Sequence, residues 1–305
     1  MPALSTHVLQ SRDCLERLKP ELEHRGIEPN ESFADFLGAC AIAHDTLGLL
    51  QGTGYARCFV TAHEKNTDAF FLAIVQFIKE NNLKNNANAM AFLYGHIMHY
   101  ALDISVHPLI YFMTEKHPAK CFGSALEAHA LFEAWVDAER EKEEKAKAEQ
   151  SGKPFDPKFP FRKKVGKGNI DALIDATYEQ VHGLKNAAAG YRHGIKIWSA
   201  YQAHLRGFML KRVKEYFPDF QAMLNVNGEN FQDPVSGDAL NISFQKAYDN
   251  SIDLACELVL AVNANIYDNA GNEDLLKKAL GHSYDTGFAW DDPRPKQYFK
   301  QYPTA

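Results

Sequence analysis

The sequence has few cysteines, and none of them form the closely spaced pairs that thiolate metal sites use. Its five cysteines are scattered along the chain: Cys14, Cys40, Cys58, Cys121 and Cys256. An odd number of scattered thiols argues against a disulfide framework and against a cysteine-ligated zinc site. The chain opens with MPALSTHVLQSRDCLERL, where no basic segment precedes an apolar stretch, so we expect no secretory signal. These features together predict a cytoplasmic protein with reduced thiols.

Long hydrophobic runs and an excess of positive charge are also missing. The longest nearly apolar run, residues 69–78, is interrupted by Gln76 and is too short to cross a bilayer, so no transmembrane segment is expected. The formal net charge of −6 argues against general nucleic-acid binding, because phosphate backbones select basic surfaces. Apolar residues make up 46% of the chain, enough to bury a substantial core. The oligomeric state is not predicted by any of these features.

Helical periodicity dominates what is present, and we predict an all-α fold. The predicted helices cover residues 8–18, 69–78, 86–106, 124–149, 170–182, 190–216 and 239–266. Asn66 or Thr67 is the expected N-cap of the second, and Ser124 with Glu127 forms a capping box for the fourth. Pro108 should end the third helix at the residue before it.

The domain organisation follows from these helices and from the breaks between them. Residues 1–150 are predicted to form a metal-binding helical core, and residues 151–168 a basic loop rich in Pro, Gly and Lys. Residues 169–305 should add helices that pack on the core within the same domain. The segment 218–238 is irregular, and the aromatic-rich tail 282–305 should cross the domain in extended form. We therefore expect a multi-helix bundle with an irregular C-terminal tail.

Two helices carry histidine and carboxylate side chains on otherwise apolar faces. In AFLYGHIMHYALDISVHP, His99, Asp103 and His107 are spaced four residues apart, so they project from one face. In EAHALFEAWVD, His129 and Glu133 repeat this spacing. Ligands at i and i+4 can reach one metal ion, as paired histidines do in helical zinc sites. A bound ion would also remove the cost of burying a carboxylate among apolar residues.

The competing interpretation is that these are ordinary core histidines bonded to backbone carbonyls. Taken together, the five residues favour a metal site, because buried charges need partners. His7, Asp45 and His63, taken singly, are equally compatible with turn or cap roles. His44 and His96 flank proposed ligands and are expected to support them or to pack in the core.

The string GHIMHYALDISVHP resembles the signature of the zinc-dependent phospholipase C family, and the HxxxE of His129 and Glu133 completes it. The opening MPALSTH is similar to the start of intracellular bacterial members. The resemblance covers roughly Met1 to Asp137 and implies a helical fold that binds two or three zinc ions. It also implies an enzyme, a phosphoric ester hydrolase acting on a small phosphoester or a lipid headgroup.

The resemblance further implies how the ligands are shared among the ions. The first ion would be held by Asp45, His63, His99 and Asp103. The second would be held by His107, His129 and Glu133. The third would be held by His7, with Asp103 bridging, and by the amino group and carbonyl of residue 1. Asp45 would also orient or deprotonate the attacking water.

Two other functions stay open at this point. The dipeptide His44-Asp45 fits an HD-type metal phosphohydrolase if His24 and Asp103 serve as its other ligands, but this leaves His129 and Glu133 unexplained. Alternatively, the protein binds a metal or a phosphorylated ligand without turnover. Ligands outnumber those of two closed tetrahedral sites and include no cysteine, which favours catalysis because catalytic zinc keeps an open position.

Overall fold

The computed structural model describes residues 4–116, 125–152, 170–204, 211, 223–229, 231–271 and 273–295. Its helices are α1 (Leu4–His24), α2 (Glu31–Gly48), α3 (Gly54–Glu64), α4 (Thr67–Glu80), α5 (Ala87–Lys116), α6 (Ala125–Gln150), α7 (Asp171–His182), α8 (Ala187–His204), α11 (Phe244–Asp268) and α12 (Glu273–Leu280). Outside the helices, the described residues make only isolated β-bridges. The predicted all-α fold is therefore confirmed.

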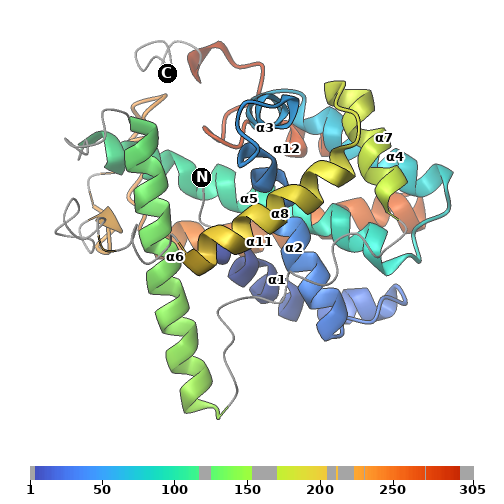
Figure 1. Cartoon of the computed structure of the whole chain (residues 1–305), viewed down its shortest axis with the longest axis horizontal. Coiled ribbons are helices and arrows are strands. Elements are labelled where there is room, and N and C mark those ends of the chain that lie inside the picture. Colours follow the sequence, from blue (N-terminus) through green and yellow to red (C-terminus); the bar gives the residue numbers. More distant parts are fainter. Residues whose placement is uncertain are drawn as a thin grey trace.

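Helix α5 runs through the middle of the molecule, with α8 crossing over it and α6 at one end (Figure 1). Every residue of α5 from Ala89 to Asp103 is buried, because α2 and α11 pack along it and α1 and α6 also contact it. A helix covered on all sides has to be apolar all round, which explains the sequence of this segment. Its few polar side chains therefore lie at the centre of the fold.

Helices α2 and α5 approach each other closely at Gly95. A Cβ atom on Gly95 would lie 2.5 Å from Cβ of Cys40 and 2.8 Å from the backbone nitrogen of Ala41. No side chain larger than hydrogen fits there. One turn further along the two helices, this contact sets Asp45 opposite His99.

The prediction that Pro108 ends the long central helix is wrong, since α5 continues to Lys116. Proline lacks the N–H that would bond the carbonyl of Ile104. The backbone of a distant turn covers that carbonyl instead, because a Cβ on Gly287 would lie 2.8 Å from the Ile104 oxygen. The helix therefore continues through Pro108, and the carbonyl that Pro108 cannot bond lies against the backbone of this turn.

Several boundaries differ from those predicted. Helix α11 begins at Phe244 rather than near residue 239, because the Ser243 side chain caps it by accepting from the Lys246 amide. Asn66, one of the two predicted residues, is the N-cap of α4, but it has a left-handed conformation and makes no side-chain capping bond. The stretch 282–289 forms a compact turn closed by a bridge between His282 and Ala289, not an extended strand. The predicted basic loop 151–168 beyond residue 152, the capping box of Ser124 with Glu127, and residues 296–305 lie outside the described part of the chain.

Core residues form a continuous cluster that includes side chains of α2, α4, α5, α7 and α11. The second half of α6 is charged, and Figure 1 shows this end of the helix extending away from the other helices. Ion pairs such as Lys147 with Glu144 run along it. This pattern is typical of a solvated helix extension.

Candidate metal centre

The structure brings all eight predicted site residues together, from five helices, and buries each of them. They are His7 of α1, Asp45 of α2, His63 of α3, His99, Asp103 and His107 of α5, and His129 and Glu133 of α6. Helical spacing aligns the residues within α5 and within α6, while packing of α1, α2 and α3 against α5 supplies the rest.

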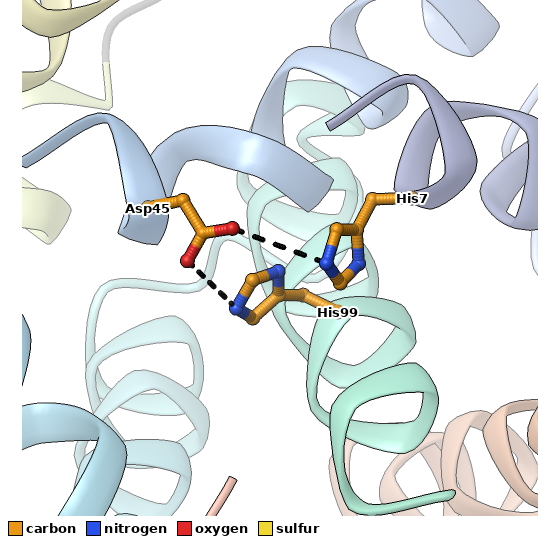
Figure 2. Close-up of side chains that lie close together, drawn as sticks. All are labelled: His7, Asp45 and His99. Atoms are coloured by element: carbon orange, nitrogen blue, oxygen red, sulfur yellow. Dashed lines mark ion pairs between the residues drawn. The ribbon is translucent and has the colours of Figure 1, made fainter. Parts of the chain in front are cut away.

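Asp45 lies beside two histidine rings, His7 and His99, that are stacked on each other (Figure 2). Its Oδ2 is 3.9 Å from Nε2 of His7, and its Oδ1 is 3.5 Å from Nε2 of His99. The two ring centroids are 4.3 Å apart. Each carboxylate oxygen therefore faces a different histidine, and the three side chains enclose a point that one metal ion could occupy.

Asp103 occupies the centre of the cluster and faces four histidines. Its oxygens are 3.1 Å from Nε2 of His99 and 3.2 Å from Nε2 of His7. Nε2 of His107 is 3.5 Å away, and Nε2 of His63 is 3.9 Å away. A carboxylate with partners on both oxygens has the arrangement needed to bridge two ions.

A further group lies where α5 meets α6. Oε1 of Glu133 is 3.0 Å from Nε2 of His129 and 3.2 Å from Nε2 of His107. The ligand atoms of these three residues all lie within 4.8 Å of one another, as do those of the sets His7–Asp45–His99 and His63–His99–Asp103. The described residues thus provide three overlapping sets of nitrogen and oxygen ligands.

The electrostatics of the cluster call for positive charge inside it. Burial opposes protonation of His99, but the carboxylates of Asp103 and Asp45 outweigh it and raise the pKa of His99 to about 9. Burial likewise opposes protonation of His107, yet Asp103 and Glu133 raise its pKa to about 10. A divalent cation can supply this charge in place of the protons, since metal binding displaces protons from its ligands.

Hydrogen bonds behind the rings give a direct test of whether a metal ion fits. Nδ1 of His107 donates to the carbonyl of Tyr284 at 2.9 Å, so its Nε2 faces Glu133 as an acceptor in the neutral ring. Nδ1 of His63 donates to the carbonyl of Phe59 in the same way, and its Nε2 faces a carboxylate oxygen 3.1 Å away. An Nε2 acceptor and a carboxylate oxygen at about hydrogen-bond distance need a proton or a metal ion between them. Histidines that bind zinc commonly donate a hydrogen bond from their other ring nitrogen, as Nδ1 does here. The residues present therefore fit zinc.

The sequence model of a family described as zinc dependent phospholipase C matches residues 6–188. The chain belongs to the zinc-dependent phospholipase C family. The match spans more than half of the chain and includes every residue of the cluster. No curated protein and no solved structure gave a match. Family and geometry together fit a metal-dependent phosphoester hydrolase.

Two groups outside the predicted set support this phospholipase C-like centre. Tyr284, beyond the matched segment, places its ring near His63 and His99, with centroids 4.9 and 5.5 Å apart. Asp137 accepts hydrogen bonds from the amides of Ser5 and Thr6, and from the Thr6 hydroxyl. Asp137 is two turns from His129 on α6, a spacing visible in the sequence, whereas the role of a Tyr284 carbonyl has no sequence signal.

Asp137 fastens the first turn of α1 to α6. Burial raises the pKa of Asp137 to about 7 despite its bonds to Thr6. The same bonds hold α1 so that His7 reaches the cluster. The predicted ligand from the amino group of residue 1 lies outside the described residues.

The residues required by the HD-type alternative are separated in this phospholipase C-like fold. Nδ1 of His44 pairs with the hydroxyl of Tyr178 at 2.8 Å, and His44 belongs to none of the three ligand sets. His24 is exposed at the last turn of α1. His96 pairs with Tyr191, so His44 and His96 are core groups beside the centre, as predicted.

Across the described residues, none of the helices combines the length and the apolar character needed to span a membrane.

Proposed function

We propose that this chain hydrolyses a phosphodiester, of a lipid headgroup or of a small soluble ester, at a cluster of two or three zinc ions. The observation that carries the proposal is Asp103, a buried carboxylate facing four histidine rings from three helices. Such a cluster among apolar side chains is costly to fold unless cations occupy it. Membership of the zinc-dependent phospholipase C family supports a hydrolytic rather than a structural role for the cluster.

The ligands are assigned by proximity and by the family resemblance. We assign Asp45, His63, His99 and Asp103 to the first ion, His107, His129 and Glu133 to the second, and His7 with Asp103 to the third. Asp45 and His99 also lie within reach of the His7 ion, so the first and third positions share ligands.

Zinc bound in this cluster supplies Lewis acidity toward the phosphoryl oxygens and lowers the pKa of water toward neutrality. Asp45 is the residue we propose to orient the attacking water and accept its proton. Its side chain keeps 10% of its surface exposed, against 3% for Asp103, so Asp45 is the carboxylate that can meet solvent. Burial opposes ionisation of Asp45, but His99 and His63 hold its pKa below the usual value, so its carboxylate is ionised at neutral pH.

The test is elemental analysis of the purified protein and of Asp103→Ala, with hydrolysis assays on p-nitrophenyl phosphodiesters and on phosphatidylcholine vesicles. We expect two to three zinc equivalents in the wild type, and loss of both zinc and hydrolysis in the variant. Activity on vesicles alone would identify a lipid substrate, and activity on the soluble ester alone a small one. A wild type that neither contains nor takes up zinc would overturn the proposal.

A pair of buried histidines on α5 provides the matched control. His99→Ala removes a proposed ligand, whereas His96→Ala removes an equally buried ring that pairs with Tyr191. Both variants should lose stability. Only His99→Ala should lose zinc.

A further inference from the structure

The turn His282–Ala289, called here the C-terminal turn, lies almost a hundred residues beyond the segment that matches the family. The amide of Ser283 donates to the carbonyl of Phe288, and the amide of Gly287 donates to the carbonyl of Ser283. Gly287 has a φ of +68°, a conformation that glycine adopts without strain. The turn is thus a rigid unit closed by its own backbone bonds.

This turn contacts two of the three ligand sets through the backbone of one residue. The carbonyl of Tyr284 accepts from Nδ1 of His107 at 2.9 Å. The amide of Tyr284 donates to the carbonyl of His63 at 2.9 Å. Tyr284 therefore joins α5 and α3 at the residues that face Asp103.

The C-terminal turn packs against α5 at Pro108 and at the Ile104 carbonyl, which Pro108 cannot bond. A Cβ on Gly287 would lie 2.8 Å from the carbonyl oxygen of Ile104 and 3.8 Å from the Pro108 ring. The turn is also fixed at its start, where the amide of His282 donates to the hydroxyl of Tyr100. A side chain at residue 287 would push the turn, and with it the Tyr284 carbonyl, away from α5.

The molecule contains a second turn of the same design, at Gln232–Ala239. Here the backbone amide of Asp233 donates to the carbonyl of Asp238, and the amide of Gly237 donates to the carbonyl of Asp233, at positions that correspond to those of the C-terminal turn. Gly237 has a φ of +76°, yet a Cβ there would meet no atom within 4 Å. The turn Gln232–Ala239 thus shares the backbone bonds of the C-terminal turn, and among the described residues it makes no hydrogen bond to a proposed ligand histidine.

We propose that Tyr284 is a positioning residue of the metal centre, whose backbone carbonyl holds the His107 ring with its proton on Nδ1 and Nε2 directed at the ion. A carbonyl can only accept, so this bond decides which nitrogen is left for the metal. The inference rests on the proposed assignment of His107 as a ligand. If Tyr284 orients His107, the C-terminal turn contributes to metal binding although it lies outside the segment that matches the family.

The test compares Gly287→Ala with Gly237→Ala. Both variants place alanine at a positive φ at the corresponding position of two similar turns, but an added Cβ meets α5 only at residue 287. We expect Gly287→Ala to weaken zinc binding roughly 10- to 100-fold, the usual effect of losing a bond behind a ligand histidine. Gly237→Ala should bind zinc like the wild type. Titration against a chelating indicator measures both, and the visible spectrum of the cobalt(II) form should change in the first variant only.

A second measurement makes the result independent of zinc. In ¹⁵N-histidine-labelled protein without metal, His107 should show an exchange-protected proton on Nδ1 in the wild type and in Gly237→Ala, with His107→Gln used for assignment. That protection should be lost in Gly287→Ala, and Tyr284→Phe, which keeps the backbone, should retain it. Equal zinc affinity and an unchanged cobalt spectrum in Gly287→Ala would overturn the inference, as would a wild type without the protected Nδ1 proton. A wild type with that proton but no zinc uptake would overturn the proposed function, and with it the metal-positioning role, while leaving the bond from His107 to Tyr284 established.

Discussion

Asp45 and Asp103 lie in one buried cluster, yet their surroundings differ in a way that separates their roles. Asp103 is enclosed by histidines on both oxygens, whereas Asp45 retains more of its surface. We expect Asp103 to hold the cluster together and Asp45 to act on water. At this scale the chemistry depends on single side chains, so single substitutions can test it.

Asp45→Asn keeps the volume of the side chain but removes its charge and its ability to accept a proton. We expect hydrolysis to fall by about 10²- to 10⁴-fold, the usual contribution of a general base. Zinc bound by His107, His129 and Glu133 should remain, whereas the first ion loses one of its four assigned ligands, so rates are compared at equal zinc content. Initial rates together with elemental analysis check this, and Asp35→Asn, ten residues earlier on α2, serves as the control. Full activity in Asp45→Asn would refute the role given to Asp45.

Asp137 should make folding stability depend on pH. Its pKa is raised from 3.8 to about 7 by burial, so the folded chain favours the neutral acid. A raised folded pKa gives stability that is complete below about pH 4 and is lost as pH rises through about 7. A difference of about three pKa units corresponds to roughly 4 kcal/mol, as an upper limit.

Asp137→Asn cannot ionise and should lack this part of the pH dependence. The amide side chain of the variant has one acceptor oxygen fewer than the carboxylate, but the resulting loss of stability is the same at every pH. The free energy of unfolding of the variant, relative to the wild type, should therefore rise between pH 4 and pH 8. Urea unfolding of both proteins in chelator measures the difference, and parallel pH curves would contradict the assignment.

Among the helices, the contact between α2 and α5 at Gly95 decides where Asp45 and His99 meet. Gly95→Ala would place a methyl group 2.5 Å from Cβ of Cys40, so the helices would have to separate. Overpacking of this kind costs about 1–3 kcal/mol. We expect weaker zinc binding as well, because the two ligands are one turn beyond the contact.

Gly54→Ala is the matched control for this substitution. Gly54 begins α3, and a Cβ there would have only Nη2 of Arg57 nearby, at 3.9 Å. Thermal unfolding and zinc titration of both variants make the comparison. If Gly95→Ala unfolds at the same temperature as Gly54→Ala, close packing at this point does not position the site.

Helical periodicity was sufficient to predict part of this centre and insufficient for the rest. The i, i+4 spacing placed His99, Asp103 and His107 on one face of α5, and the structure has them there. Spacing within a helix says nothing about which helices meet, so His7 and His63 depended on the family resemblance.

Other features depend on contacts that no local pattern contains. Pro108 was predicted to end its helix because the rule considers only the chain around it, whereas the carbonyl freed by Pro108 is covered by Gly287, far along the sequence. The bond from His107 to Tyr284 involves a backbone carbonyl, which every residue has. Neither feature could be read from residue types.

For the whole molecule, the cluster acts as a junction of α1, α2, α3, α5 and α6. Each of these helices contributes at least one buried side chain to the cluster, and three of those side chains are carboxylates. Without cations, the fold has to hold these charges by protonating histidines. Metal binding and folding should therefore be coupled, because the unfolded chain cannot present the same ligands together.

Removal of zinc with a chelator should lower the unfolding temperature of the protein, and added zinc should restore it. At a free zinc concentration of a hundred times its dissociation constant, one site adds about 2.7 kcal/mol to the free energy of unfolding, and several sites add more. Magnesium should not restore stability, since it prefers six oxygen ligands and this cluster is rich in imidazole. Differential scanning calorimetry with chelator, then with either metal, measures the effect. An unfolding temperature indifferent to zinc would mean that the buried carboxylates are held by protonated histidines alone.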